Sequence, residues 1–164
     1  REGYDEVLQI DGDGQHDPAE VAHLVDAKQA LGADVVIGAR FAGRGDYVVR
    51  GPRRWAMKML STVLSRVCRT QLTDVTSGLQ LCGSRAIALY SKEYPAEYLG
   101  DTVEAIVIAA RSGLVVRQAG VSMRERVGGT PSHSPVKAAI FLVRAMVALT
   151  IALTRPARAL AEAS

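Results

Sequence analysis

Two aspartates, Asp11 and Asp13, stand two residues apart in the run Asp-Gly-Asp-Gly-Gln-His-Asp-Pro, which directly follows a short apolar segment. Carboxylates at this spacing can share one hard divalent cation, and the amide of Gln15 would add a neutral oxygen ligand. A calcium loop of the EF-hand kind does not fit, because its sixth position is His16 rather than glycine and its twelfth is Ala22 rather than glutamate. The run predicts either a site for a divalent cation or a plain turn rich in aspartate.

Charge is divided unevenly along the chain, although the net charge is only +3. Residues 1–34 hold nine acidic residues against two basic ones, whereas residues 40–70 hold eight basic residues against one acidic residue. The acidic segment could hold a metal ion and the basic segment could hold phosphate. Two solvated surfaces that neutralise each other would give the same balance, so charge alone leaves both interpretations open.

The candidate cation site must be held by the elements around it. Residues 6–10 read as a short buried strand, residues 17–31 as a helix and residues 34–38 as a second strand. A strand, a helix and a strand in this order favour a parallel α/β sheet with a right-handed crossover. Open α/β sheets bind ligands at the carboxyl ends of their strands, which is where Asp11 and Asp13 follow the first strand.

Turn and capping residues mark the other elements. Asp17 is the expected N-cap of the first helix, with Pro18 at its first position, and Gly32 and Gly113 are expected to end helices. Further helices are expected over residues 55–69, 84–90 and 101–111, and extended segments over residues 79–81 and 114–126.

Composition removes several classes of protein. Only 5% of the 164 residues are aromatic, so stacking on single-stranded nucleic acid is not expected and no nucleic-acid partner is predicted. The two cysteines, Cys68 and Cys82, are too few for a disulfide framework or a four-ligand zinc site. The apolar fraction of 48% and the charged fraction of 23% are typical of a globular chain.

Residues 136–154 form a long apolar segment whose only charges are Lys137 and Arg144. On a helix, these two cations and Arg155 share one side, and apolar side chains occupy the opposite side. This pattern predicts an amphipathic helix that lies in a membrane interface rather than crossing the bilayer. An amphipathic helix packed on the domain or on a partner chain is the alternative.

Four motifs occur in the order seen in family 2 glycosyltransferases. They are Asp-Gly-Asp-Gly-Gln-His-Asp-Pro at 11–18, Val-Ile-Gly-Ala-Arg-Phe at 36–41, Asp-Val-Thr-Ser-Gly-Leu at 74–79 and Arg-Glu-Arg-Val-Gly-Gly at 124–129. The chain most resembles the branch that transfers a sugar to polyprenyl phosphate, the dolichyl-phosphate mannose synthase type. The resemblance implies an α/β fold, a partial GT-A (Rossmann-like) nucleotide-diphospho-sugar transferase fold. This fold would occupy residues 1–134, and the amphipathic membrane-interface helix and tail would occupy residues 135–164.

The resemblance also implies a ligand set and a donor substrate. Asp11 and Asp13 would be the Asp-x-Asp pair that binds Mg²⁺ or Mn²⁺, with Gln15 as a further ligand. The metal would bridge the diphosphate of a nucleotide sugar and neutralise the charge that builds on the leaving group. Because guanidinium groups make bidentate contacts with phosphate, substrate-binding roles are expected for the arginines of the second and fourth motifs, Arg40, Arg124 and Arg126.

Two departures from the family pattern concern the acceptor. Family members carry serine where this chain has Pro131, so a hydroxyl that binds substrate would come from Ser132 or Thr130. Many members also carry a carboxylate pair ahead of a helical glutamate, and here that pair reads Asp101-Thr102, with threonine where the base is usual. A phosphate monoester, with a second pKa of about 6, is already an anion at neutral pH and needs no base, which agrees with a lipid phosphate acceptor.

The candidate catalytic residues are two carboxylates, Asp74 and Asp101. Asp74 would orient or deprotonate the acceptor, or would form a buried turn instead. Family members begin with a nucleotide-binding part ahead of the Asp-x-Asp strand, and by this resemblance residues 1–164 lack that part of the fold. We therefore expect this chain alone to be catalytically inactive, with an exposed sheet edge beside its first strand that favours association with a second copy.

The expected function is that of a metal-dependent, inverting glycosyltransferase with a nucleotide-diphosphate sugar as donor and polyprenyl phosphate as acceptor. It would act at the cytoplasmic face of the cell membrane, as a peripheral or C-terminally anchored protein. One alternative is the same fold acting on a soluble or polysaccharide acceptor. The other is a non-catalytic remnant that binds a membrane or a partner through residues 136–158.

Overall fold

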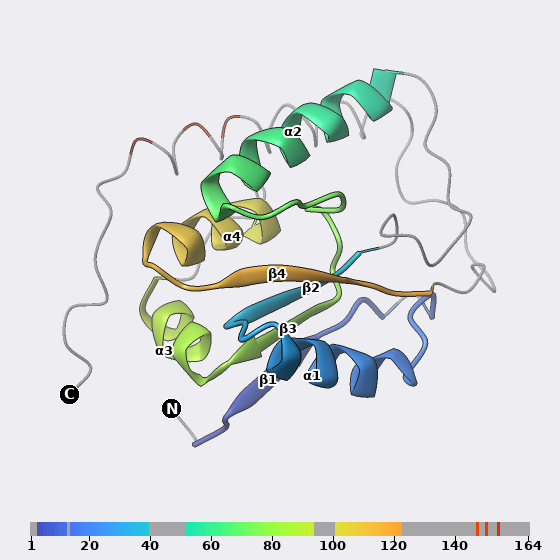
Figure 1. Cartoon of the computed structure of the whole chain (residues 1–164), viewed down its shortest axis with the longest axis vertical. Coiled ribbons are helices and arrows are strands. Elements are labelled where there is room, and N and C mark those ends of the chain that lie inside the picture. The colour runs from blue at the N-terminus through green and yellow to red at the C-terminus, as the bar shows by residue number, and fades with distance from the viewer. Residues whose placement is uncertain are drawn as a thin grey trace.

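The computed structural model describes residues 3–12, 14–39, 52–93 and 101–122, together with Val147, Thr150 and Thr154. In these ranges the chain forms four strands and four helices, in the order β1, α1, β2, α2, β3, α3, α4 and β4 (Figure 1). The strands are β1 (Glu6–Gln9), β2 (Val35–Ala39), β3 (Gln80–Gly83) and β4 (Val116–Gly120). The helices are α1 (Glu20–Ala30), α2 (Pro52–Cys68), α3 (Ser84–Glu93) and α4 (Asp101–Arg111).

The sheet is mixed, and the prediction of a parallel sheet is wrong. Its strand order is β1-β3-β2-β4. β3 is antiparallel to both of its neighbours, whereas β2 and β4 are parallel. β1 and β2 run in the same direction, as a crossover requires, but β3 lies between them. The sequence showed only a short extended segment at residues 79–81, and its place in the sheet depends on pairing with residues far away in the chain.

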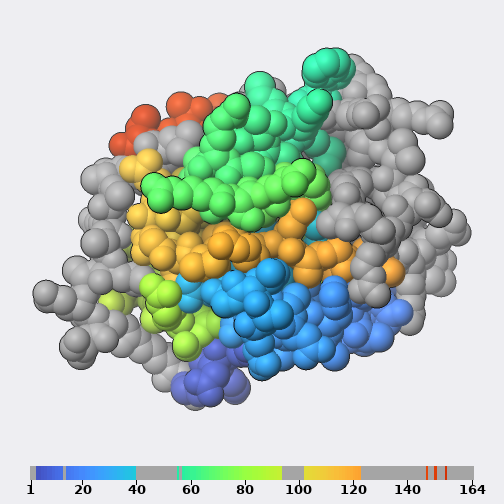
Figure 2. Space-filling view, in the orientation of Figure 1, coloured from blue at the N-terminus to red at the C-terminus, as the bar shows by residue number. Residues whose placement is uncertain are grey.

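Helices cover both faces of the sheet. Because successive side chains of a strand point to opposite faces, Val35 and Ile37 join one apolar cluster and Val36 joins the other. The first cluster is completed by α2, α3 and α4, and the second by Leu24 of α1. Figure 2 shows β4, in orange, as a band between α1, in blue, and α2 with the segment that follows it, in green. The chain thus forms the α/β architecture that the sequence predicts.

β1 is more exposed than the predicted buried strand. Only Leu8 is half-buried among its four residues, and Val7 is 46% exposed. The cause is its position, since β1 pairs with β3 alone and forms one edge of the described sheet. This exposed edge agrees with the expectation of an unprotected strand, but association with a second copy stays a prediction.

Helix boundaries differ from the predicted ones at some ends and agree at others. α1 begins at Glu20 rather than at Pro18, because Asp17 forms a tight turn in which its Oδ1 atom accepts a hydrogen bond from the Ala19 amide at 3.0 Å. α2 begins at Pro52, three residues before the predicted start, and proline suits the first turn of a helix. α4 has its predicted bounds. The glycines expected to stop α1 and α4 both adopt left-handed backbone, with φ of +55° at Gly32 and +77° at Gly113.

The strand directions bring the sequence motifs together. β1, β2 and β4 all run the same way, so their carboxyl ends meet at one end of the sheet, here called the carboxyl end (Figure 1). Asp11 follows β1 there, and Arg40 directly follows β2. Because β3 runs in the opposite direction, it starts at this end, and residues 74–79 lead into it. The fold therefore gathers segments from distant parts of the sequence.

The predicted amphipathic helix at residues 136–154 lies outside the described residues, apart from three positions. Val147, Thr150 and Thr154 are each helical and exposed. Among the described residues, no helix has both the length and the apolar character needed to cross a bilayer. The orientation of this segment relative to a membrane stays a prediction, as does the domain boundary at residue 134.

Candidate functional site

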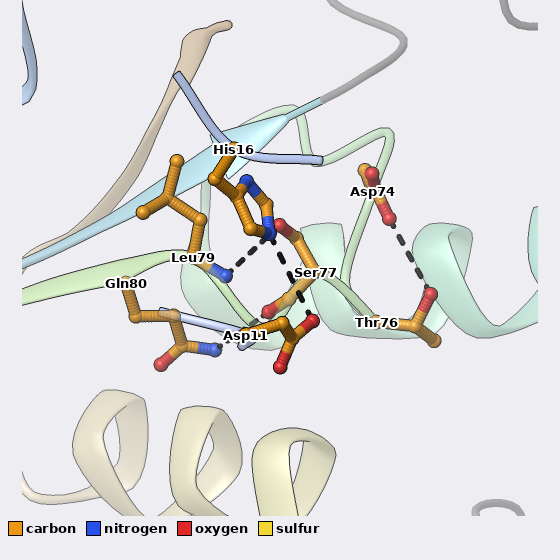
Figure 3. A network of polar contacts seen from close by, with 7 residues as sticks. All are labelled: Asp11, His16, Asp74, Thr76, Ser77, Leu79 and Gln80. Atoms are coloured by element: carbon orange, nitrogen blue, oxygen red, sulfur yellow. Dashed lines mark hydrogen bonds and ion pairs between the residues drawn. The ribbon is translucent and has the colours of Figure 1, made fainter. Parts of the chain in front are cut away.

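Asp11 lies directly against the segment that leads into β3. A methyl group added at Gly78 would overlap the Asp11 carboxyl group, because the three heavy atoms nearest to that position are the Cγ, Oδ1 and Oδ2 atoms of Asp11. Figure 3 shows the Asp11 side chain beside Ser77 and Leu79, which flank Gly78. The Asp11 side chain is nevertheless 55% exposed. The first and third motifs are therefore in contact, with a carboxylate accessible to solvent where they meet.

His16 also lies close to the Asp11 carboxylate. Its side chain is only 3% exposed, and its Nε2 atom lies 3.8 Å from Asp11 Oδ2 (Figure 3). That distance is longer than a hydrogen bond but within the range of an ion pair. The Nδ1 atom is buried and accepts or donates no hydrogen bond within the described part of the chain. The imidazole thus limits where the Asp11 side chain can move.

The sequence pattern does not predict His16 as a residue of the site. The available signal for a role of His16 in the site is its position inside the first motif, residues 11–18. Its burial and its proximity to Asp11 depend on folding of the loop, which residue types alone do not determine.

The turn that carries Gly78 is held by its own polar groups. The Leu79 amide donates a hydrogen bond to Ser77 Oγ at 3.3 Å, and Gln80 Nε2 donates to the Ser77 carbonyl at 3.4 Å (Figure 3). The Gly38 amide donates to the Leu79 carbonyl at 2.9 Å, which ties the turn to β2. Ser77 and Gln80 are both buried. The main chain at Gly78 is therefore fixed on both sides.

The preceding residues are anchored to two other elements. The Thr73 amide donates to Gln118 Oε1 on β4 at 2.8 Å, and Gln118 Nε2 donates to Thr73 Oγ1 at 3.2 Å. The Leu72 amide donates to Ser65 Oγ on α2 at 2.9 Å. These contacts hold residues 72–73 between α2 and β4, so the turn that faces Asp11 rests on a rigid support.

Asp74, a predicted catalytic residue, is completely buried in this segment. Thr76 Oγ1 donates a hydrogen bond to Asp74 Oδ1 at 3.4 Å (Figure 3). A buried carboxylate is stable only where polar partners surround it, so the position suits an Asp that shapes the turn. Its action on an acceptor stays a prediction. The other candidate, Asp101, is the first residue of α4, and its side chain lies outside the described part of the structure.

The predicted phosphate-binding residues Arg40, Arg124, Arg126 and Ser132 lie outside the described residues, but the points at which their segments leave the sheet are described. The Val121 amide donates to the Ala39 carbonyl at 3.1 Å. Ala39, just before Arg40, and Val121, two residues before Met123, therefore lie side by side at the carboxyl end of the sheet.

Of the predicted metal ligands, the structure describes Asp11 and the half-buried Gln15, and Asp13 lies outside the described residues. Among the described residues, no three His, Cys, Asp or Glu side chains gather closely enough to hold a metal ion. The donor types fit a hard divalent cation, since Asp11 offers an accessible carboxylate and Gln15 an amide oxygen. Asp11 would thus need Asp13 to complete the predicted pair.

The two thiols take no part in this site. Burial raises the pKa of Cys68 and of Cys82 to about 11, and at Cys68 the nearby Arg117 opposes the shift. Both groups are therefore neutral thiols at physiological pH, which makes them poor nucleophiles and poor metal ligands. Both serve packing, since Cys68 belongs to the first apolar cluster and Cys82 packs against it.

Two curated proteins are similar to this chain. The undecaprenyl-phosphate mannosyltransferase of Micrococcus luteus is 30% identical over 139 residues, which cover 80% of this chain and 54% of the relative. The polyprenol monophosphomannose synthase of Mycolicibacterium smegmatis is 35% identical over 86 residues, which cover 48% of this chain and 29% of the relative. Both similarities support a family of polyprenyl-phosphate glycosyltransferases. No protein-family model matches the chain.

The chain spans about half the length, or less, of these curated relatives, with 54% and 29% of their residues matched. The longer match includes most of the described fold, because 80% of this chain is aligned. These similarities agree with the branch that the four motifs indicate.

Proposed function

We propose that this protein is a family 2 glycosyltransferase that moves a sugar from a nucleotide-diphosphate sugar to a polyprenyl phosphate. The observation that carries the proposal is the contact between Asp11 and Gly78, which joins the Asp-x-Asp motif to the Asp-Val-Thr-Ser-Gly-Leu motif at the carboxyl end of the sheet. The names of the two relatives, one for undecaprenyl phosphate and one for polyprenol monophosphomannose, support the lipid acceptor.

In this proposal Asp11, Asp13 and Gln15 hold Mg²⁺ or Mn²⁺. When bound, the cation neutralises the negative charge that develops on the departing nucleoside diphosphate. Asp11 is suited to this task because its carboxylate is accessible while its position is limited by Gly78 and His16. The metal dependence is a prediction from the donor types and the resemblance.

Arg40, Arg124 and Arg126 would bind the phosphate groups of donor and acceptor, with the hydroxyl of Ser132 or Thr130 as a further contact. Support comes from the sheet, because the described residues just before these segments, Ala39 and Val121, are joined by a hydrogen bond. Guanidinium groups that approach from two neighbouring segments could hold a diphosphate on one side and a lipid phosphate on the other.

The transfer itself would be a single displacement. An oxygen of the lipid phosphate forms a bond to the anomeric carbon of the sugar while the bond from that carbon to the diphosphate breaks, which inverts the configuration. Because the phosphate attacks as an anion, no side chain has to remove a proton. Asp74 would orient the acceptor or shape the turn beside Asp11, and Asp101 at the start of α4 is the other candidate catalytic residue.

The protein would act at the cytoplasmic face of the membrane, held by residues 135–164. Lys137, Arg144 and Arg155 would then lie among lipid phosphates, each contributing about 1 kcal/mol near an anionic surface. Co-sedimentation with anionic vesicles tests this part, and the binding should weaken at high salt and when the three cations are replaced by glutamine. Undiminished binding of that triple variant would contradict it.

The decisive experiment for the activity is a transfer assay on a full-length version that includes a nucleotide-binding part, with labelled nucleotide sugars and three acceptors. These are a polyprenyl phosphate, the corresponding polyprenol without phosphate, and a free sugar. Transfer to the polyprenyl phosphate alone is the expected result, since the proposed nucleophile is a phosphate anion. Transfer to the free sugar would favour the soluble-acceptor alternative, and the absence of both transfer and donor binding would favour a non-catalytic protein.

A further inference from the structure

We infer that Gly78 is a positioning residue for Asp11, and that the missing side chain at position 78 makes the room in which the Asp11 carboxylate lies. The part of this inference that concerns a cation rests on the proposed function. The part that concerns packing rests on the described contact alone.

Space, rather than backbone conformation, explains the glycine. Gly78 is not among the described glycines with positive φ, so its backbone is open to other residues. What excludes a side chain is the Asp11 carboxyl group, whose three heavy atoms are the nearest neighbours of the missing Cβ. By contrast, a Cβ at Gly12, in the same loop as Asp11, would meet no heavy atom within 4 Å.

A larger residue at position 78 would displace the Asp11 carboxylate and leave the turn in place. The turn is held by the hydrogen bonds of Leu79 to Ser77 and of Gly38 to Leu79, and it leads into a strand paired on both sides. Asp11 lies in an exposed loop and its side chain is 55% exposed. The buried His16 ring also lies close to it, with Nε2 3.8 Å from Oδ2. A methyl group at position 78 would therefore turn the Asp11 carboxylate outward into solvent, away from position 78 and from His16.

Turning this carboxylate would weaken the binding of a divalent cation. Metal affinity depends on outer groups that orient the direct ligands, and their loss typically lowers affinity by about 10- to 100-fold. Gly78 acts in this way without touching the cation, since it only leaves room for the ligand. This distinguishes it from the Asp-x-Asp pair itself.

The test is a cycle of four proteins, namely the wild type, Gly78→Ala, Asp11→Ala and the double variant. Without metal, the melting temperature of each is measured by circular dichroism. We expect Gly78→Ala to lower the melting temperature more when Asp11 is present than when it is replaced by alanine, because the carboxyl group is the nearest obstruction to the new methyl. An equal effect in both backgrounds would overturn the inference.

The second readout is Mn²⁺ binding, followed by the loss of the free-ion signal in electron paramagnetic resonance. Gly78→Ala should weaken Mn²⁺ binding by about 10- to 100-fold relative to the wild type. A wild type that binds no Mn²⁺ would contradict the proposed metal dependence, while the metal-free cycle would still decide the packing inference. If Gly78→Ala does not fold, the double variant should recover the fold, and its failure to do so would also overturn the inference.

Discussion

The side chain of Glu20, at the first position of α1, accepts a hydrogen bond through Oε1 from the backbone amide of Ser122 at 3.1 Å. These residues stand 102 positions apart in the sequence. The contact ties the helix that follows the Asp-x-Asp loop to the end of β4, just before the segment that carries Arg124 and Arg126.

Replacing Glu20 by alanine should loosen this connection. A hydrogen bond to a charged group contributes about 1.5 to 3 kcal/mol, and an exposed one lies at the lower end of that range. We therefore expect faster tryptic cleavage after Arg124 or Arg126 in Glu20→Ala, measured by mass spectrometry of timed digests. Glu20→Gln keeps an oxygen acceptor and should be cleaved at a rate closer to that of the wild type. Equal rates for all three proteins would show that the contact does not restrain this segment.

In a full-length version that includes a nucleotide-binding part, replacing Asp13 by asparagine should reduce sugar transfer to background while leaving the fold intact. A neutral amide cannot replace the charge of a carboxylate ligand to a divalent cation. Transfer activity and the circular dichroism spectrum are the two measurements. Asp26→Asn is a matched control, because Asp26 is an exposed residue of α1 and should tolerate the same change. Full activity of the wild type in excess EDTA would exclude the metal.

Replacing Gln118 by leucine should destabilise the support of the turn. The half-buried Thr73 amide would lose its acceptor on β4, and a typical hydrogen bond contributes about 0.5 to 1.5 kcal/mol to stability. Urea denaturation should show a lower free energy of unfolding by about that amount. Gln118→Glu keeps an acceptor oxygen for the Thr73 amide and should retain more stability. If the leucine and glutamate variants had equal free energies of unfolding, the hydrogen bond to Thr73 would make no contribution to stability.

The buried thiol of Cys68 and the half-buried thiol of Cys82 predict a loss of stability at alkaline pH. Burial raises the pKa of Cys68 and Cys82 from 9.0 to about 11, so the folded state favours the neutral thiol. Their contribution is fully present below about pH 9 and is lost as the pH rises through about 11, because the unfolded chain releases these protons first. The free energy of unfolding should fall over this range, and less steeply in Cys82→Ala. Rapid alkylation of both thiols by iodoacetamide at pH 8 in the folded protein would contradict their burial.

Local signals in the sequence were sufficient for several elements. α4 has its predicted bounds because the apolar pattern ends before Gly113, and a glycine in left-handed backbone commonly stops a helix. The Asp-x-Asp run was correctly placed after a strand, since a sharp change from apolar residues to aspartate and glycine marks the end of β1. These predictions depend on residues close together in the chain.

The features that the sequence did not reveal depend on distant partners. The position of β3 between β1 and β2 requires pairing of Gln80 with both Gln9 and Ile37. The burial of His16 and the empty space at Gly78 become visible only when two motifs some sixty residues apart meet at the carboxyl end of the sheet. A histidine and a glycine in polar loops carry no local signal of such a contact.

β3 lies between β1 and β2 in the sheet but follows both in the sequence, and this affects how the chain can fold during synthesis. No two strands of the described sheet form a hairpin, since β1 pairs only with β3 and even the nearest pair joins Ile37 to Gln80. A nascent chain that has emerged only as far as α2 would expose the open backbone groups of both β1 and β2, which favours aggregation until Gly83 has left the ribosome. Pairings this far apart also predict slow folding. Chaperones that bind extended apolar segments would therefore be most important for this protein after β1 and β2 have been synthesised and before β3 has.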